Sequence, residues 1–377
     1  MKLVIFGLTI TSSWGNGHAT LWRGLCRALV RRGHDITFYE RDVPYYAAHR
    51  DLLALDGVDI VLYSDWQDVR HAAARAVADA DVAMVTSYCP DAIVATTLIA
   101  DRAALSVFYD MDSPTTLDRM HRGDAVSYIG SNGLRDVDLV LSYAGGAALP
   151  AIRDTLGARR VAPLYGSVDP ALHRPMPAEP QYAATLSYLG TYADDRQPAL
   201  DRLFIEAARV RPDERFVIGG AQYPDTFPWT PNIFFVRHLP PPSHPAFFCS
   251  SPITLNITRR AFAELGHCPS GRLFEAAACG AAVVSDWWDG LDEFFTPGEE
   301  ILVARDTADV LAAIDLPREE LARIGRAARQ RTLAEHTADH RAVELEGILE
   351  DVLQPEHVHH TRPPLFPAEA SPRQLEA

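Results

Sequence analysis

The sequence predicts an α/β protein built from two doubly wound domains that face a central cleft. Three observations lead to this prediction. The chain has 377 residues, which is long for a single domain. Short apolar runs with strand character alternate with runs of helical character, a pattern typical of a parallel sheet covered on both faces. A proline-rich stretch at residues 161–180 interrupts the alternation, which then restarts.

The first half of the chain is expected to form one sheet with its covering helices. An amphipathic run at 19–32 ends in basic residues followed by Gly33, as the end of a helix prefers. Helical stretches separate several of the apolar runs. The expected strands are 2–8 (KLVIFGL), 35–40 (DITFYE), 58–64 (VDIVLYS), 81–88 (DVAMVTSY), 104–110 (ALSVFYD) and 137–143 (VDLVLSY).

The second half repeats this alternation and ends in a long helical stretch at 317–353. The expected strands are 186–192, 215–222, 233–239, 251–257, 281–286 and 300–304. We therefore predict a first domain at 1–165, a linker at 166–180, a second domain at 181–350 and a disordered tail at 351–377. The tail includes HVHH at 357–360, which we interpret as solvated, with adventitious metal binding as the alternative.

Composition excludes some classes of function. The formal net charge of −15 argues against a protein that binds nucleic-acid backbones, because such proteins need a basic face. The five cysteines form no CxxC motif and favour free thiols in a reducing compartment. The N-terminus has the pattern of a first strand and not of a signal peptide, and no apolar run reaches membrane-spanning length. We expect a cytoplasmic protein; its oligomeric state is open.

The stretch PSGRLFEAAACG at 269–280 has the chemistry of an anion site. Ser270 and Gly271 stand at an expected helix start, where free backbone N–H groups and the helix dipole favour phosphate. Arg272 adds a formal positive charge. Glu275, roughly one turn further, is placed to accept hydrogen bonds from a sugar diol. A capped helix with a solvated Glu is the alternative.

The loop after the first strand, SSWGNGHAT, is expected to face the cleft. Gly15, Asn16 and Gly17 allow a close approach of backbone to ligand, and His18 stands at the helix start. A histidine there serves as a general base toward an acceptor hydroxyl, steadies a phosphate, or merely caps the helix.

A rival interpretation of the same loop is a dinucleotide site. GNGHAT approaches the GxGxxG pattern, and Glu40 follows about 20 residues later. Thr20 replaces the third glycine, and the glycines come well after the strand, so we rank a nicotinamide dehydrogenase behind the alternatives.

Other polar residues follow the expected strands. In the first domain, Asp110 and Asp112 stand at the end of an expected strand. We interpret Asp110 as a residue on the acceptor side or as an alternative base. The alternatives are a structural role in the turn and a metal site formed by the Asp-x-Asp pair. Arg196 is expected to reach the phosphates of a ligand. The alternative is a surface arginine that forms an ion pair with Asp194 or Asp195. Further ligand-facing candidates at strand ends are Gly190, Thr191, Tyr192 and Gly220, with Asn256 and Arg259 as weaker ones.

These motifs resemble those of a known family. The segment 273–303 is similar to the donor site of nucleotide-sugar glycosyltransferases with the two-domain GT-B fold, through Glu275–Gly280, Gly290 with Glu293, and Gly298-Glu299. The linker YGSVDPALHRP resembles the family's Gly-x-Asp-Pro segment. Across residues 1–350 the chain looks like the CgeB-like branch, through SSWGNGHATLWRGL, FYDMDSPTTL, LSYLGTYADDRQ, GGAQYP and CPSGRLFEAAACG.

The resemblance implies a metal-independent transferase that uses a nucleotide-diphosphate sugar as substrate and needs no cofactor. Glu275 would bind the ribose hydroxyls and the residues at 270–272 the diphosphate. Arg237, His238 and Leu239 lie in the loop that meets the base. The acceptor, a hydroxyl-bearing molecule that the sequence does not identify, would bind the first domain.

One position departs from the pattern of related retaining enzymes. They carry a second Glu near the transferred sugar, eight positions before the first. Here that position is His267, which we include among the donor-site residues. The departure leaves the sugar contacts and the anomeric outcome open. It also keeps open a non-catalytic protein that binds nucleotides or carbohydrates on the same fold.

Overall fold

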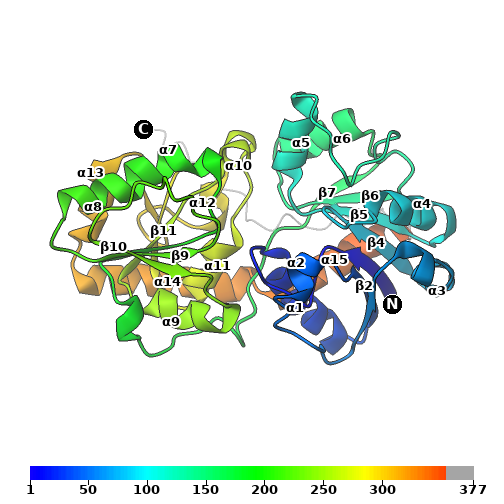
Figure 1. Ribbon diagram of the computed structural model, residues 1–377, viewed down its shortest axis with the longest axis horizontal. Coiled ribbons are helices and arrows are strands. Elements are labelled where there is room, and N and C mark those ends of the chain that lie inside the picture. Colours follow the sequence, from blue (N-terminus) through cyan, green and yellow to red (C-terminus); the bar gives the residue numbers. More distant parts are fainter. Residues whose placement is uncertain (354–377) are drawn as a thin grey trace, which may run out of the picture.

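The computed structural model describes residues 1–353 and contains two parallel sheets, one in each half of the chain (Figure 1). The first sheet has seven strands in the order β3-β2-β1-β4-β5-β6-β7, and the second has six in the order β10-β9-β8-β11-β12-β13. The fold class predicted from the sequence is confirmed. The predicted tail lies outside the described residues, except that residues 351–353 end the last helix.

The strands of the first sheet all pair in parallel, with Ile5 of β1 opposite Phe38 of β2 on one side and Met84 of β4 on the other. The strands are β1 Lys2–Gly7, β2 Asp35–Arg41, β3 Val58–Tyr63, β4 Val82–Thr86, β5 Ser106–Asp110, β6 Leu139–Ser142 and β7 Val161–Pro163. The helices are α1 His18–Arg31, α2 Pro44–Ala47, α3 Trp66–Asp79, α4 Ala92–Arg102, α5 Ser113–His121 and α6 Ala148–Leu156.

The second sheet is also parallel, and Tyr188 of its central strand β8 lies opposite Ile218 and Leu255. Its strands are β8 Leu186–Leu189, β9 Phe216–Gly220, β10 Ile233–Arg237, β11 Ile253–Asn256, β12 Ala282–Ser285 and β13 Leu302–Val303. The helices are α7 Gln197–Leu200, α8 Glu206–Val210, α9 His244–Cys249, α10 Arg260–Leu265, α11 Gly271–Ala278, α12 Leu291–Phe294, α13 Thr307–Ile314, α14 Arg318–Glu335 and α15 Ala338–Leu353, with a π-helical stretch at Asp201–Ile205. Short 3-10 turns occupy Pro180–Tyr182, Asp194–Arg196 and Pro241–Ser243.

The inner strands of each sheet are buried on both faces, which explains their continuous apolar runs, whereas the edge strands β3 and β10 are partly exposed. In β1, Leu3 and Ile5 join the core beneath one face, and Val4 and Phe6 join the core on the other. Successive strand residues point to opposite faces, so a strand covered on both sides has no polar alternation.

Two segments differ from the sequence-based expectation. The stretch at 161–180, expected to have no regular structure, begins with strand β7, a short edge strand that ends in a proline. Helix α15, expected in the second domain, packs on the first: Ala342, Leu345 and Leu349 are buried with Leu25 and Leu29 of α1. Figure 1 shows this orange helix against the blue and cyan domain.

The chain crosses between the two halves twice, and the two crossings pair with each other. The Val168 N–H donates to the carbonyl of His336 at 3.1 Å, and the Ala338 N–H donates to the carbonyl of Val168 at 2.8 Å. Among the described residues, no helix has the length and apolar character needed to cross a membrane.

The strand order reverses at the centre of each sheet, between β1 and β4 and between β8 and β11. Loops that leave the C-terminal ends of such strands diverge and form a crevice, where ligands of doubly wound proteins bind. The loops after β1 and β8 contain the polar residues singled out in the sequence, so the topology places those residues at the two crevices.

Candidate active site

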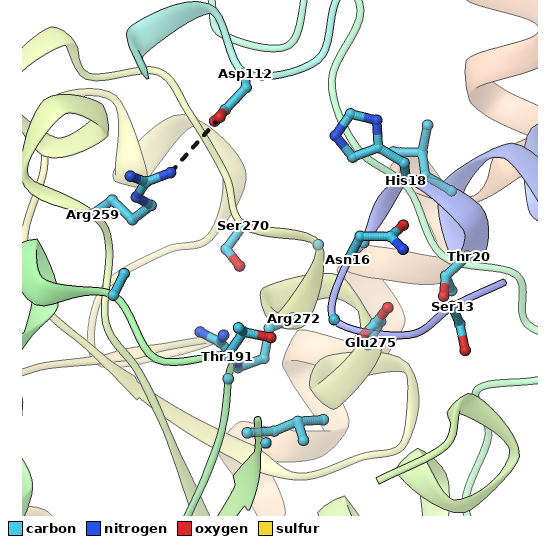
Figure 2. Close-up of a pocket in the computed structure, with 18 of the residues that line it drawn as sticks. Ser13, Asn16, His18, Thr20, Asp112, Thr191, Arg259, Ser270, Arg272 and Glu275 are labelled. Atoms are coloured by element: carbon cyan, nitrogen blue, oxygen red, sulfur yellow. Dashed lines mark ion pairs between the residues drawn. The ribbon is translucent and has the colours of Figure 1, made fainter. Parts of the chain in front are cut away.

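A cleft of about 550 Å³ lies between the two domains and receives residues from both. Figure 2 shows side chains from the first domain, among them Asn16, His18 and Asp112, facing Arg259, Arg272 and Glu275 of the second. Of the predicted site residues, those that line the cleft are Gly15, Asn16, Gly17, His18, Gly190, Thr191, Tyr192, Arg196, Gly220, His238, Leu239, Ser270, Gly271, Arg272 and Glu275.

The loop after β1 is held by a buried carboxylate. Glu40, at the end of β2, accepts hydrogen bonds from the Thr9 and Thr11 hydroxyls and from the Ile10 and Thr11 N–H groups, at 2.6–3.0 Å. All of these contacts are structural, so no oxygen of Glu40 faces a ribose. The dinucleotide interpretation of GNGHAT therefore has no support from Glu40.

The same loop positions His18 without using it as a cap. The Asn16 side-chain oxygen accepts the Ala19 N–H at 3.2 Å and thereby holds the start of α1, while His18 is the first helical residue. Its Nδ1 is buried and has no hydrogen-bond partner within residues 1–353, and its ring packs edge-on to Tyr88. Burial lowers the pKa of His18 to about 4, so the imidazole is neutral near pH 7.

Asp112, and not Asp110, faces the cleft. Asp110 is fully buried at the end of β5, where one oxygen accepts the Asp112 N–H at 3.0 Å and burial raises its pKa to about 7. Asp112 lines the cleft, accepts the Tyr88 hydroxyl at 2.6 Å and lies 3.7 Å from Nη1 of Arg259 in the second domain. The assignment of Asp110 to the acceptor side is corrected: it shapes the turn that presents Asp112.

The start of α11 offers unpaired donors to the cleft. Ser270 caps the helix with extended backbone angles, but its hydroxyl makes no capping bond in the described chain. Nη1 of Arg272 donates to the Asn256 side chain at 3.0 Å, its guanidinium lies 5.0 Å from the Tyr188 ring centre, and its buried Nε has no partner within residues 1–353. Burial lowers the pKa of Arg272, and an anion would compensate for that burial.

Arg196 contributes a second guanidinium beside this helix start. Its Nη1 donates to the Thr191 carbonyl at 2.9 Å, and its Nε is without a partner in the described part of the chain. The alternative pairing with Asp194 or Asp195 does not occur; Asp195 pairs with Arg259 at 3.2 Å instead. Arg196 therefore pairs with no carboxylate of residues 1–353, and it lines the cleft.

Two glycines keep backbone close to Arg272. A Cβ on Gly190 would lie 2.8 Å from Nη2 of Arg272, and Gly220 adopts a φ of 154° with its Cα packed on the Gly190 carbonyl. The Tyr223 hydroxyl donates to that carbonyl at 3.1 Å. Side chains at these positions would push the loop into the space in front of the guanidinium.

Glu275 lies one turn into α11 between two histidines. Its carboxylate oxygens are 3.9 Å from Nε2 of His173 and 3.7 Å from Nδ1 of His244. Burial raises the pKa of Glu275, but the neighbouring His173, His244 and Arg272 outweigh this effect and lower the pKa to about 2. Glu275 is thus an ionised hydrogen-bond acceptor at neutral pH.

Two more predicted residues fall outside the cleft. Arg237 ends β10 and is exposed. The His267 ring packs between Gly146 of the first domain and Gly290 of the second, and its Nε2 lies 3.0 Å from Glu293. His267 therefore joins the domains and does not line the cleft, which corrects its assignment to the donor site.

Sequence reasoning ranked Asp112 and Arg259 too low, placed Tyr88 among the cleft aromatics without giving it a role, and missed His173 and His244. Asp112 and Arg259 both follow strands, so their positions carried a signal. His173 lies in the linker and His244 begins a short helix, and no local pattern marks either one. Tyr88 and His238 have positive φ, at 62° and 47°, in the part of the molecule that borders the cleft.

Comparison with known families identifies the second domain. A family model described as glycosyl transferase-like matches residues 196–347, which include Arg196, Arg259, Arg272 and Glu275. This part of the chain is similar to that family. The comparison with curated proteins found no match.

Solved structures share the fold over nearly the whole chain. Sucrose-phosphate synthase of Thermosynechococcus elongatus has a TM-score of 0.67 at 11% identity, over 94% of this chain and 100% of that one. An alpha-glucosyltransferase in complex with UDP has a TM-score of 0.68 at 13% identity, and the match covers 93% of this chain and 100% of that one. HepE of Anabaena in complex with UDP-glucose has a TM-score of 0.65 at 13% identity, and the match covers 93% of this chain and 100% of that one. The architecture is that of the GT-B glycosyltransferases.

Proposed function

We propose that this protein transfers a sugar from a nucleoside-diphosphate sugar to a hydroxyl-bearing acceptor. The observation that carries the proposal is the set of groups at the start of α11: free helix N–H groups and Arg272, with Arg196 beside them and ionised Glu275 one turn away. Cationic and N–H donors match a diphosphate, and a carboxylate acceptor matches a ribose diol. The family match at residues 196–347 supports the same assignment.

The donor is proposed to bind the second domain with its diphosphate at Ser270, Gly271 and Arg272. Its ribose hydroxyls donate to Glu275, and its base meets the loop at His238 and Leu239, both of which line the cleft. Two of the similar structures named above hold UDP or UDP-glucose, which makes UDP the first nucleotide to test.

The acceptor is proposed to enter from the first domain. Its hydroxyl oxygen bonds to the anomeric carbon as the bond between that carbon and the diphosphate oxygen breaks. Neutral His18 accepts the hydroxyl proton, and the nucleoside diphosphate departs against Arg272, Arg196 and the start of α11. These positive groups sit where the leaving charge develops, so we propose that departure needs no metal and that the enzyme uses no cofactor.

The finer assignments also belong to the proposal. Motifs across residues 1–350 favour the CgeB-like branch of the GT-B enzymes, and UDP-glucose in similar structures favours a hexosyl donor. The polar, aromatic walls around His18 and Tyr88 favour a catalyst over a binding protein that has lost its chemistry.

Thermal unfolding with nucleotides tests the proposal. UDP, GDP, dTDP, ADP and NAD are compared on the wild type and on Glu275→Ala, with Glu264→Ala as control, because Glu264 is an exposed carboxylate on the neighbouring helix α10. A ligand at 100 times its dissociation constant adds about 2.7 kcal/mol to the free energy of unfolding. We expect one nucleoside diphosphate to stabilise the wild type and Glu264→Ala but not Glu275→Ala.

Turnover is then measured as release of that nucleoside diphosphate from its sugar conjugates. Release that depends on His18 supports the transferase, and binding without release in the presence of an acceptor library supports a non-catalytic protein. Stabilisation by NAD alone would remove the transferase from consideration.

A further inference from the structure

Three ligand atoms converge at the edge of the cleft, beside the expected ribose site. His173 comes from the linker between the domains, His244 begins α9, and Glu275 lies on α11. Nε2 of His173 is 3.9 Å and Nδ1 of His244 is 3.7 Å from the carboxylate oxygens of Glu275. All three ligand atoms lie within 4.8 Å of one another.

The histidine nitrogens that face Glu275 have no hydrogen-bond partner within residues 1–353. Nε2 of His244 lies 3.1 Å from the Leu239 carbonyl, to which it donates, so the lone pair of the neutral ring is on Nδ1. Neither ring nitrogen of His173, which is 1% exposed, has a hydrogen-bond partner among residues 1–353. Nε2 of His173 and Nδ1 of His244 each offer a lone pair to a metal ion in the matching neutral tautomer, and the Glu275 carboxylate supplies a negative charge beside them.

We propose that His173, His244 and Glu275 form a binding site for a transition-metal ion of the Zn²⁺ class. Tetrahedral Zn²⁺ with bonds of about 2.0–2.1 Å separates its ligand atoms by about 3.4 Å, so the N···O distances here need to shorten by only a few tenths of an ångström. Two imidazoles and a carboxylate suit Zn²⁺ and its neighbours, whereas Mg²⁺ and Ca²⁺ prefer oxygen ligands. His244 and Glu275 border the cleft, which leaves the fourth position accessible.

The site shares Glu275 with the proposed ribose contact, so metal and nucleotide are expected to exclude each other. Because both carboxylate oxygens face the histidines, a bound ion takes up the acceptor capacity that a ribose diol requires. The antagonism rests on the proposed function, but metal binding does not. Zinc is therefore expected to inhibit donor binding and not to take part in transfer.

Direct zinc titration tests the site. Full-length, untagged and metal-stripped protein competes for Zn²⁺ with a chromophoric chelator near neutral pH. We expect one tight equivalent for the wild type and at least a ten-fold loss of affinity in His173→Ala, His244→Ala and Glu275→Gln, as expected when one of three ligands is removed. Melting curves of the metal-free variants check folding, and His244→Ala is the milder change because its ring borders the cleft.

Two controls separate this cluster from other histidines. His71→Ala alters an exposed histidine on α3. A variant with His357, His359 and His360 replaced by Ala removes the HVHH motif near the C-terminus. Both controls are expected to keep the tight equivalent. Absence of that equivalent in the wild type, its retention in His244→Ala, or its loss only in the HVHH variant would each overturn the site.

Saturating UDP tests the antagonism. Linkage requires that, if zinc weakens UDP binding, UDP weakens zinc binding by the same factor. We expect a ten-fold or greater weakening of zinc affinity, whereas zinc affinity unaffected by bound UDP contradicts the shared use of Glu275. If no nucleotide binds but the zinc equivalent persists, the proposed function fails and the metal site stands.

Discussion

Arg272 combines burial with an incomplete set of partners. Its Nη1 bonds to Asn256 and its plane approaches Tyr188, but Nε has no partner in the described chain, and burial lowers its pKa. A buried guanidinium with free N–H groups at a helix start is a receptor for a bidentate anion. The residue is thus more consistent with phosphate binding than with a structural ion pair.

Replacing Arg272 is expected to weaken nucleoside-diphosphate binding selectively. Hydrogen bonds to charged groups contribute about 1.5–3 kcal/mol, so Arg272→Ala should raise the Kd for UDP roughly ten- to a hundred-fold. Arg272→Lys should recover part of the lost affinity, since lysine keeps the positive charge but cannot donate two parallel hydrogen bonds as a guanidinium does. Arg260→Ala, an exposed arginine on α10, is the control in isothermal titration. Equal affinity in Arg272→Ala and the wild type would contradict the assignment.

His18 differs from an ordinary histidine in its protonation. Burial lowers its pKa from 6.5 to about 4, because the charged imidazolium is disfavoured away from water. At pH 5 to 8 the ring is therefore neutral and able to accept a proton.

The pH dependence of kcat/KM should reflect this shift. If His18 is the base, kcat/KM should stay level as the pH falls through 6.5 and decline only as it approaches 4, where His18 becomes protonated. His18→Gln should lower kcat by about 10²–10⁴-fold, the usual contribution of a general base, with little effect on UDP affinity. His121→Gln, an exposed histidine on α5, is the control. An inflection near pH 6.5 that disappears in His18→Gln would contradict the burial of this ring.

At the scale of elements, the position of α11 is fixed by its packing against α14. Gly280 ends α11 with a φ of 80°, and Gly325 of α14 packs directly on the Gly280 carbonyl. Only a residue without a Cβ permits this approach. The contact fixes the helix that carries Arg272 and Glu275.

Two glycine-to-alanine changes should shift stability in opposite directions. A Cβ on Gly325 would overlap the Gly280 carbonyl oxygen, so Gly325→Ala should lower the free energy of unfolding by about 1–3 kcal/mol. Gly347 lies in α15 with no atom within 4 Å of an added Cβ, so Gly347→Ala should raise it by about 0.5–1 kcal/mol through helix propensity. Urea unfolding measures both, and a stabilised Gly325→Ala would show that α14 is not pressed against α11.

At the scale of the whole molecule, the last described helix belongs to the first sheet. Helix α15 follows the second crossing and buries Leu345 and Leu349 against α1, which begins with His18. The ion pair between Asp112 and Arg259 and the bond from the Gly145 N–H to the His267 carbonyl, at 2.9 Å, also join the two domains. The chain therefore ties the first domain to the second at several points beside the cleft.

Truncation of a buried side chain in α15 should destabilise the first domain. Leu345→Ala should destabilise the protein by about 2–5 kcal/mol, the usual effect of removing a buried leucine. Amide hydrogen exchange should show the loss of protection in α1. Val343→Ala, an exposed position on the same helix, is the control and should change stability by less than about 0.5 kcal/mol. Loss of protection confined to α14 would contradict this packing.

Local patterns in the sequence determined much of this protein. Apolar runs predicted both parallel sheets, because strands buried on two faces leave a continuous signal. The helix start at 270–275 and the loop at 15–18 were identified because turn and helix-start chemistry depends on neighbouring residues. Residues 15–18 and, from the helix start, Ser270, Gly271, Arg272 and Glu275 line the cleft.

Tertiary structure alone decided which side chains meet. It turned Asp112 into the cleft and Asp110 away from it, placed His267 between two glycines, moved α15 onto the first domain and brought His173 and His244 to Glu275. Each of these results depends on contacts between segments far apart in the chain. Periodicity and short motifs report on a residue and its neighbours, whereas the orientation of a side chain at a domain interface is set by what packs against it from elsewhere.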